Sequence, residues 1–213
     1  MIFKPFPKMA RLRRQCIITE KIDGTNASVY IGPTDFKTPN ESVATFFKKN
    51  GTALGMWAGS RTRWITTAND NFGFAEWVVD NAPELFGLGE GHHFGEWWGS
   101  GIQRNYGLTD RRFSLFNVSR FHLHGEESKE RPTADPRVIK TTLELPPCVG
   151  LVPVLAEGLF DTTQINRLVE TLRQDGSQAA PGFMKPEGIV VYHIAGNVGF
   201  KRTLDKDDEP KGP

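Results

Sequence analysis

The heptapeptide Glu20-Lys21-Ile22-Asp23-Gly24-Thr25-Asn26 stands between two stretches that have the pattern of β-strands. The short apolar run 16–18 precedes it, and the alternating run 27–31 follows it. The sequence therefore predicts a strand, a turn at Gly24 and a second strand. A sheet would hold the amine of Lys21 in place, and a glycine lets a ligand approach the backbone closely. Lys21 is thus a candidate nucleophile, although an ordinary hairpin turn has the same short pattern.

Composition limits the class of protein. The chain has 213 residues, enough for one large domain or two small ones. Its 26 basic and 25 acidic residues leave a net charge of +1, so only a local basic patch would indicate nucleic acid. Five Trp and fifteen Phe are candidates for stacking on bases. The N-terminal arm is one candidate patch, with a solvated arm as the equal alternative, and its basic residues are Lys4, Lys8, Arg11, Arg13 and Arg14.

Cysteine content and hydropathy indicate the compartment. Cys16 and Cys148 lie in apolar runs, which is typical of buried thiols rather than of a disulfide framework. The sequence lacks an apolar run of about 18 residues and an N-terminal signal core. We therefore predict a soluble, cytoplasmic protein (in the host cytoplasm if it is viral) with no membrane partner.

The remaining chain alternates strand patterns with two or three helix patterns. Apolar spacing predicts helices over 69–81, limited by Pro83, and from Asp161 to about Gly176. We expect an α+β fold of mostly antiparallel sheets flanked by helices. It would form one domain over residues 1–203, followed by a polar tail, 204–213. The other expected strands are 56–65, 93–98, 113–118, 187–192 and 198–201, and the expected loops include 32–49 and 125–136.

Further short motifs follow the heptapeptide in a set order. Together they resemble motifs I, Ia, III, IIIa, IV and V of the covalent nucleotidyltransferases, which are DNA ligases, RNA ligases and mRNA capping enzymes. Each motif alone is weak, but the ordered series spans residues 20–201 and is specific. The motifs in order are Lys21-x-Asp23-Gly24, Ser60-Arg61, Phe94-Gly95-Glu96, Phe116, Glu187-Gly188-Ile189-Val190 and Phe200-Lys201.

The branch of this superfamily follows from Asn26, because DNA ligases and capping enzymes usually have arginine there. The heptapeptide is similar to nick-sealing RNA ligases, and 60–64 and 99–107 are similar to phage and bacterial RNA ligases. The resemblance implies a nucleotidyltransferase (ATP-grasp-like) fold with ATP and Mg²⁺ or Mn²⁺ as cofactors. Many relatives have a C-terminal domain that grips nucleic acid. Here we expect the catalytic domain only, as a monomer, with a possible separate nucleic-acid-binding partner.

The resemblance also implies roles for residues. Lys21 would attack the α-phosphorus of ATP as a free amine. Lys201, with Arg202 beside it, would lower the pKa of that amine and neutralise the α-phosphate. Glu187 is the expected metal-side carboxylate. The other expected nucleotide-binding residues are Glu20 (adenine amino group), Ile22, Asp23, Gly24, Asn26 (adenylate phosphate or nick), Arg61 (ribose or 5′-phosphate), Glu96 (ribose hydroxyls, or metal as a second choice) and Phe116 (adenine stacking).

We therefore expect an ATP-dependent RNA ligase that joins 5′-phosphate and 3′-hydroxyl ends through a lysyl-AMP intermediate. Its substrate would be RNA or an RNA-ended nicked duplex, with Arg104, Arg111 and Arg112 contacting nucleic acid. The alternatives are a small DNA nick ligase and a non-catalytic nucleic-acid-binding domain. The intact Lys21, Glu96 and Glu187 argue against the latter. Thr203 stands where RNA ligases commonly have a second motif V lysine, so Arg202 is a candidate substitute.

Overall fold

The computed structural model describes residues 2–6, 9–34, 41–132 and 139–205. Contacts within the chain divide it into two compact units, which we describe separately. The first unit comprises Met1–Lys21, Pro132–Lys140 and Pro153–Pro213, and the second comprises Ile22–Arg131 and Thr141–Val152. The boundary thus falls inside the heptapeptide, directly after Lys21. The predicted single domain over residues 1–203 stays a prediction.

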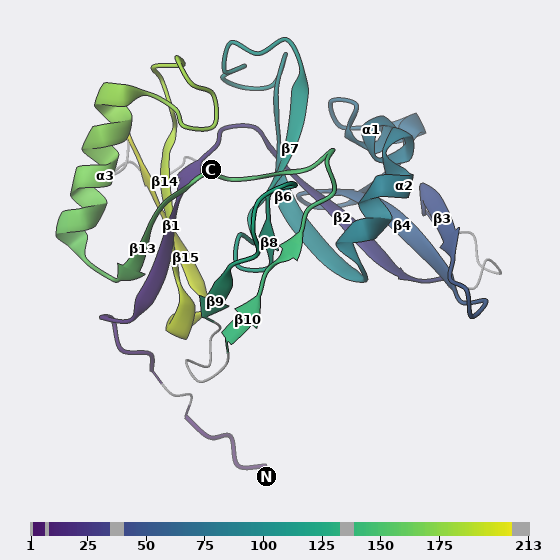
Figure 1. Ribbon diagram of the computed structural model, residues 1–213, viewed down its shortest axis with the longest axis horizontal. Helices are drawn as coiled ribbons and strands as arrows, with labels where there is room; N and C mark the ends of the chain where they lie inside the picture. Colours follow the sequence, from purple (N-terminus) through teal and green to yellow (C-terminus); the bar gives the residue numbers. More distant parts are fainter. Residues whose placement is uncertain (1, 7–8, 35–40, 133–138, 206–213) are drawn as a thin grey trace. The chain divides into compact units, whose positions relative to one another are not determined.

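The first unit contains a four-stranded antiparallel sheet and one long helix (Figure 1). The strand order is β13-β1-β14-β15, so β1 pairs with strands that come more than a hundred residues later in the chain. The elements are β1 (Gln15–Lys21), β13 (Val154–Leu159), α3 (Thr162–Asp175), β14 (Gly188–His193) and β15 (Val198–Thr203).

Helix α3 covers one face of this sheet. Asp161 caps the helix, because its carboxylate accepts a hydrogen bond of 2.8 Å from the backbone N–H of Thr163. Gly176 ends the helix, as predicted, with φ of 83°. The buried stripe of the helix packs on alternate residues of β1 and β14, and this cluster comprises Ile165, Val169 and Leu172 with Cys16, Ile18, Ile189 and Val191. The opposite sheet face carries Thr19 and Lys21.

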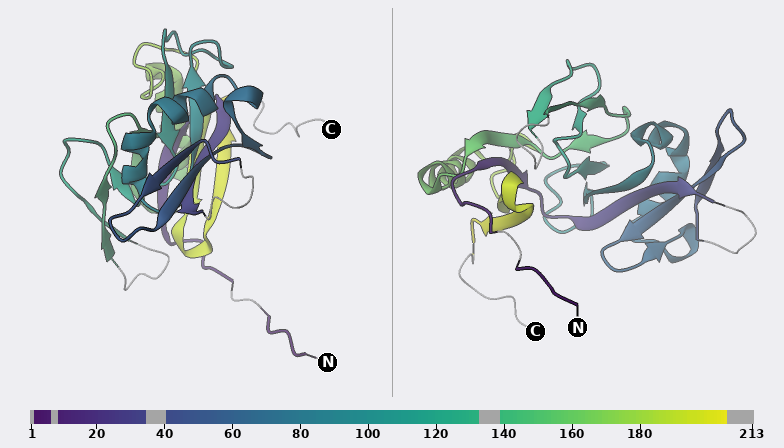
Figure 2. Two further views of the ribbon diagram at one scale, coloured as in Figure 1. Left: turned by 90° about the vertical axis from the view of Figure 1, so that its right-hand side faces the viewer. Right: turned by 90° about the horizontal axis from the view of Figure 1, so that it is seen from below.

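The second unit contains a seven-stranded sheet of order β12-β7-β6-β2-β4-β3, with β5 paired to β4 (Figures 1 and 2). Its pairs are antiparallel except for β12 with β7. The strands are β2 (Thr25–Pro33), β3 (Ala44–Phe47), β4 (Ala53–Ser60), β5 (Trp64–Ile65), β6 (Gly91–Gly99), β7 (Arg111–Leu115) and β12 (Gly150–Leu151).

Alternation along β2 decides which face of this sheet is buried. Ala27, Val29 and Ile31 join the apolar core, whereas Ser28 and Tyr30 point to the other face. The core also contains residues of two short helices, α1 (Phe74–Asp80) and α2 (Ala82–Leu85). The shorter strands are β8 (Phe121–His122), β9 (Glu130–Pro132), β10 (Ile139–Thr141) and β11 (Leu143–Glu144), and the 3-10 turns are Thr67–Asn69, Phe86–Leu88 and Ile194–Gly196.

The mixed α+β class is confirmed, but several boundaries differ from prediction. Helix α1 begins later than expected, because Phe72 and Gly73 have left-handed φ angles of 51° and 71°. Pro83 does not limit a helix, since it lies in the first turn of α2. The expected strand 56–65 breaks at a turn into β4 and β5, and β3 lies in the expected loop. In the part of the chain that is described, no helix is long and apolar enough to cross a membrane.

Candidate active site

Lys21 ends β1, and its amine forms an ion pair with a carboxylate from a distant part of the sequence. The Nζ atom donates to Oε2 of Glu187 over 2.6 Å. The side chains of Lys21 and Glu187 are 24% and 14% exposed, so both remain accessible. The structure thus brings together the predicted nucleophile and the predicted metal-side carboxylate, which are 166 positions apart.

Strand pairing explains how these two residues meet. Lys21 lies opposite Gly188 on β14, and Gly188 lies opposite Thr203 on β15. Gly188 has a φ of 154°, and a Cβ atom there would be 2.1 Å from the carbonyl oxygen of Arg202. The glycine of the predicted motif IV is therefore required for the close pairing that puts Glu187 beside Lys21.

The two cations of motif V lie on opposite faces of the sheet. Lys201 lies opposite Val190, which lies opposite Thr19, so Lys201 shares the Lys21 face. It is two strands across and two residues along from Lys21, about 12 Å away. Arg202 lies opposite Ile189 on the α3 face, and it donates a hydrogen bond to Asn166 of that helix. Lys201 is therefore the motif V cation that faces the Lys21 side, whereas Arg202 is placed to support the helix.

Glu20 also points to the α3 face, away from Lys21. Its carboxylate accepts hydrogen bonds from the Ser177 hydroxyl (2.6 Å) and from the backbone N–H groups of Gln178 (2.8 Å) and Ala179 (2.9 Å). The side chain is buried, and this desolvation raises its pKa above the ordinary value, while the three hydrogen bonds lower it. This placement favours an anchor for residues 177–179 over the predicted contact with adenine.

We predict that Glu20→Ala lowers the free energy of unfolding by at least ~2 kcal/mol, because three donors lose a charged acceptor. Thermal unfolding should report a melting temperature lower by about 4–8 °C. Glu170→Ala is the matched control, since Glu170 is an exposed residue of α3 whose partners, among the described residues, are Arg173 and Gln174. Unchanged stability of Glu20→Ala, with weakened ATP binding, would restore the predicted adenine contact.

In the second unit, Glu96 holds the turn of the heptapeptide. Its carboxylate accepts from the backbone N–H of Gly24 and from the side-chain amide of Asn26, both over 3.0 Å. Glu96 and Asn26 are also direct cross-strand partners on β6 and β2. The predicted ribose-binding carboxylate and the branch-defining asparagine therefore form one hydrogen-bonded group.

Gly24 is at a position where only a glycine fits. A Cβ atom there would be 2.4 Å from the carbonyl oxygen of Trp97 and 2.7 Å from Cβ of Trp98. The turn therefore packs directly on β6, and the neighbouring Ile22 is buried. Gly24 is thus needed for close packing within its own unit, and the approach of a ligand to its backbone stays a prediction.

The loop that follows β6 braces the same turn. The Tyr106 hydroxyl accepts from the backbone N–H of Asp23 over 2.8 Å, and Arg104 Nε donates to the Asp23 carboxylate over 2.9 Å. Tyr106 is buried and has a left-handed φ of 53°. Tyr106 was not predicted as a site residue. Its sequence signal is its place in a loop that contains several glycines.

The arginines predicted to contact nucleic acid have partners within the second unit. Arg104 pairs with Asp23, as described. Arg112 donates to the Asp110 carboxylate over 2.9 and 3.3 Å, and Arg111 donates to the carbonyl oxygens of Ser100 and Phe72. These contacts shape the loop, and phosphate binding by the three residues stays a prediction.

Two other predicted ligand-binding residues are accessible. Arg61 is exposed in the turn between β4 and β5, and among the described residues it has no hydrogen-bond or ion-pair partner. Phe116 follows β7, is 42% exposed, and donates its backbone N–H to the carbonyl oxygen of Phe94. Both are free to meet a ligand.

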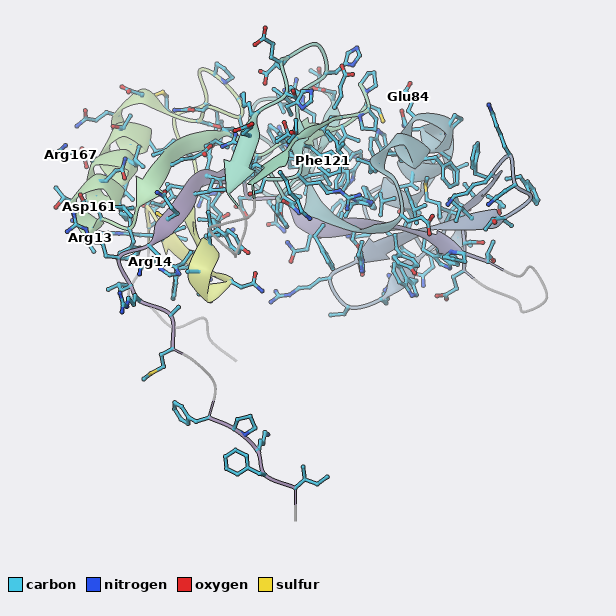
Figure 3. All side chains as sticks on the ribbon, turned by 60° about the horizontal axis from the view of Figure 1, so that its bottom comes forward. Arg13, Arg14, Glu84, Phe121, Asp161 and Arg167 are labelled. Atoms are coloured by element: carbon cyan, nitrogen blue, oxygen red, sulfur yellow. The ribbon has the colours of Figure 1, made fainter. Side chains whose placement is uncertain are left out.

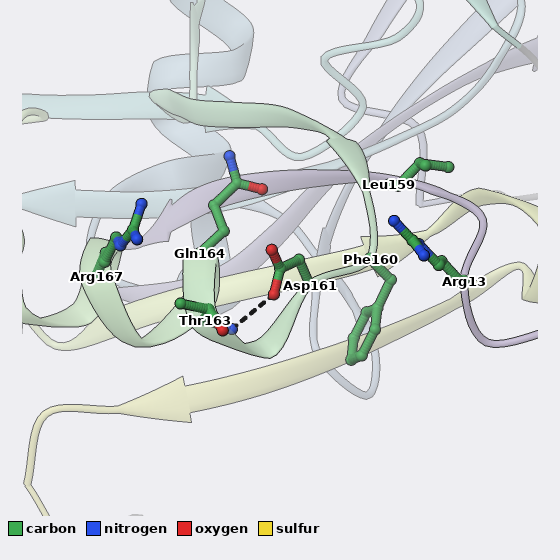
Figure 4. A pocket seen from close by; sticks show the side chains of 7 residues that line it. All are labelled: Arg13, Leu159, Phe160, Asp161, Thr163, Gln164 and Arg167. Carbon is green, nitrogen blue, oxygen red and sulfur yellow. Dashed lines mark hydrogen bonds between the residues drawn. The ribbon is translucent and has the colours of Figure 1, made fainter.

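A pocket of about 480 Å³ lies elsewhere in the first unit, at the start of α3 (Figures 3 and 4). Arg13 and Arg167 line it, and so does Asp161, whose carboxylate caps the helix. Arg13 precedes β1 and Lys21 ends it, so the pocket is about 20 Å from the predicted nucleophile. We assign it no part in nucleotide transfer. The predicted role of the basic arm stays a prediction, and Lys8 lies outside the described residues.

The donor set suits one particular kind of metal site. No group of three or more His, Cys, Asp or Glu side chains that could hold a metal occurs in the described ranges. Magnesium, however, is commonly held by one or two carboxylates together with substrate phosphates. Glu187, accessible and on the same sheet face as Lys201, fits that arrangement.

The sequence is similar to a known protein family. The RNA ligase family profile matches residues 14–205, which is nearly the whole chain. No curated protein matches the sequence.

Solved structures of the Naegleria gruberi RNA ligase have the same fold. A ligand-free mutant aligns with a TM-score of 0.55 and 19% identity, over 94% of this chain and 53% of the other. A mutant with ATP and manganese aligns with a TM-score of 0.52 and 19% identity, over 91% and 51%. A third, with AMP and manganese, gives 0.54 and 19%, over 93% and 53%. The chain thus spans about half the length of these relatives, and by its family match it belongs to the RNA ligase family.

Proposed function

We propose that this chain is an ATP-dependent RNA ligase that joins 5′-phosphate and 3′-hydroxyl ends. The observation that carries the proposal is the ion pair between Lys21 and Glu187, at the motif I and motif IV positions of an RNA ligase family chain. We further propose that both units contribute to one catalytic domain, which the family match over residues 14–205 supports.

Lys21 supplies the nucleophile. Its Nζ atom forms a bond to the α-phosphorus of ATP while the bond to pyrophosphate breaks, which leaves AMP on the lysine. AMP then passes to the 5′-phosphate of the polynucleotide, and attack by the 3′-hydroxyl releases it. The amine must be uncharged to attack, and a free lysine is about 99.9% protonated at pH 7. The Lys21–Glu187 pair therefore has to open before the first step, since a carboxylate stabilises the ammonium form.

Glu187 is the residue that we propose for binding Mg²⁺ or Mn²⁺. A bound divalent cation offsets the negative charge of the triphosphate. Structures of the Naegleria gruberi RNA ligase with ATP and manganese, and with AMP and manganese, support this pairing of cofactors. Lys201, on the Lys21 face, is the cation that we propose for the α-phosphate.

The second unit supplies the proposed nucleotide contacts. Glu96 has a buried carboxylate that already accepts two hydrogen bonds, and we propose that it also meets the ribose hydroxyls. Phe116 would stack on adenine, and Arg61 would contact the ribose or the 5′-phosphate. Asp23, Gly24 and Asn26 would position the adenylate through the backbone and side chains of the turn.

Incubation with α-labelled ATP and a divalent cation tests the proposal. We expect the label to stay on the denatured protein and then to move to a 5′-phosphorylated oligonucleotide. Sealing is compared for two nicked duplexes, one with RNA and one with DNA at the 3′-hydroxyl side of the nick. The comparison distinguishes an RNA ligase from a small DNA nick ligase. Protein that takes no label from ATP would refute the proposed function, and label without transfer to either kind of end would refute the ligase reaction.

A further inference from the structure

The second unit carries an accessible group of aromatic rings on the sheet face opposite its core. They come from four different strands, β2, β4, β5 and β6, and none belongs to the apolar core cluster. We call this group the aromatic platform, and its members are Tyr30, Trp57, Trp64, His92 and Phe94.

Strand register puts these residues on one face. Tyr30 lies opposite both Trp57 and His92, and Ser28, two residues earlier on β2, lies opposite Phe94. Residues that face each other across antiparallel strands share a sheet face. Phe94 is 54% exposed and Trp64 is 36% exposed, so this face is accessible.

The rings form a connected series. The His92 and Phe94 rings stack with their centroids 4.0 Å apart. The Trp64 ring also stacks on His92, with centroids 5.5 Å apart. The Tyr30 ring lies 5.7 Å from His92 and 5.4 Å from Trp57. His92 is also tied to the Ser28 hydroxyl over 3.0 Å. The platform is therefore held in place before any ligand arrives.

Glycines let the rings lie along the sheet. A Cβ atom at Gly55 would be 2.4 Å from the Trp57 ring, and one at Gly32 would be 2.5 Å from the Tyr30 hydroxyl. These rings thus lean over positions where a side chain would block them. Aromatic rings on an accessible sheet face are the kind of surface on which nucleic-acid bases stack.

The platform is continuous with the proposed nucleotide contacts. Glu96 and Phe94 are two residues apart on β6, so they share a face at a separation of about 7 Å. Asn26, which donates to Glu96, is likewise two residues from Ser28 on β2 and shares its sheet face. A polynucleotide end that reaches Glu96 and Asn26 therefore has its neighbouring nucleotides over the platform.

Charge and polarity also suit a polynucleotide. Arg61, three positions before Trp64, is a guanidinium without a hydrogen-bond or ion-pair partner among the described residues and could meet a backbone phosphate. Burial lowers the pKa of His92 below its ordinary value, so its ring is neutral at pH 7 and stacks without charge. The ring series contains no aliphatic side chain.

From these observations we infer that the aromatic platform binds unpaired RNA bases next to the ends that are joined. The inference rests on the proposed function and deepens it, because it assigns the substrate single-stranded nucleotides beside the junction. Bases inside a duplex are already stacked on one another, so only unpaired bases can present a face to these rings.

The test measures RNA binding without ATP. A 3′-dye-labelled, unstructured oligoribonucleotide with a 5′-phosphate is titrated with wild-type protein and with Phe94→Ala, and anisotropy gives the dissociation constants. We expect Phe94→Ala to bind about 5- to 150-fold more weakly, the effect of one base–aromatic stack. A fully paired nicked duplex should show less than a twofold change. Equal affinity of both proteins for the single strand, or an equal loss for the duplex, would overturn the inference.

Two further variants separate stacking from folding. Phe94→Tyr keeps an aromatic ring and should restore binding, whereas Phe94→Leu keeps an apolar side chain and should not. Phe46→Ala is the matched control, since Phe46 is 47% exposed on the same sheet and its ring contacts Phe86 on the core side. Restored binding with Phe94→Leu, or a comparable loss with Phe46→Ala, would contradict stacking by Phe94.

Labelling with α-labelled ATP distinguishes this inference from the proposed function. Self-adenylylation of the wild-type protein is measured in parallel, because that step needs no polynucleotide. If wild-type protein takes no label but Phe94→Ala loses RNA affinity, the proposed function fails and the platform stands. If wild-type protein takes label and Phe94→Ala binds RNA normally, only the platform fails.

Discussion

Lys21→Ala should abolish the transfer of label from α-labelled ATP to the protein. The reaction needs an amine at the end of β1, and alanine supplies none. Lys201, a cation on the same sheet face, is two strands across and two residues along, about 12 Å away. A residual signal below ~1% of the wild type is therefore expected, a loss of at least ~2.7 kcal/mol of transition-state stabilisation.

Lys21→Arg is the accompanying variant. It keeps a positive charge beside Glu187, so the fold and melting temperature should be retained, but a guanidinium stays protonated and cannot attack phosphorus. Lys48→Ala is the matched control, since Lys48 is also a lysine paired with a glutamate, Glu90, in the second unit. Undiminished labelling of Lys21→Ala would remove Lys21 from its proposed role.

Local patterns were sufficient to predict the strands that carry the motifs. β1, β14 and β15 each have apolar or alternating runs, and all three occur close to the predicted positions. Helix α3 was predicted with its cap and its end, because Asp161 and Gly176 act through contacts within a few residues. These elements depend on short-range physics that the sequence displays directly.

Elements that depend on unusual backbone angles were missed. The late start of α1 requires a left-handed conformation at Phe72, which an aromatic residue rarely adopts. The carbonyl oxygen of Phe72 accepts hydrogen bonds from Trp97 and Arg111, so distant parts of the second unit hold this conformation. Such tertiary contacts leave no periodic signal in the sequence.

Side-chain partners in the candidate site were also beyond prediction. The motifs predicted that Glu20 and Lys21 both contact the nucleotide. In β1, however, these neighbouring side chains point to opposite sheet faces, and the position of α3 decides which face is covered. Arg104 was predicted to contact nucleic acid, which stays a prediction, but its pairing with Asp23, 81 positions away, was not foreseen. The aromatic platform was visible only as a high aromatic content, since its five rings come from four strands.

Glu187→Gln should lower self-adenylylation by at least ~100-fold without a large change in stability. Glutamine keeps a hydrogen-bond acceptor for Lys21 Nζ, but it removes the charge that we propose for binding the divalent cation. The side chains of Glu187 and Lys21 are 14% and 24% exposed, so both still reach water, and exchange of a charged for a neutral hydrogen bond should cost about 1–2 kcal/mol.

The sign of the effect decides between two roles for Glu187. If the carboxylate served only to hold Lys21 in its protonated, resting form, its neutralisation would free the amine and raise the rate of labelling. If the carboxylate supports the reaction with ATP, the rate falls and raised Mg²⁺ or Mn²⁺ recovers part of it. Gln164→Ala, on α3 in the same unit, is a control for general damage. An increased rate in Glu187→Gln would overturn the metal-binding role, while Lys21 would remain the nucleophile.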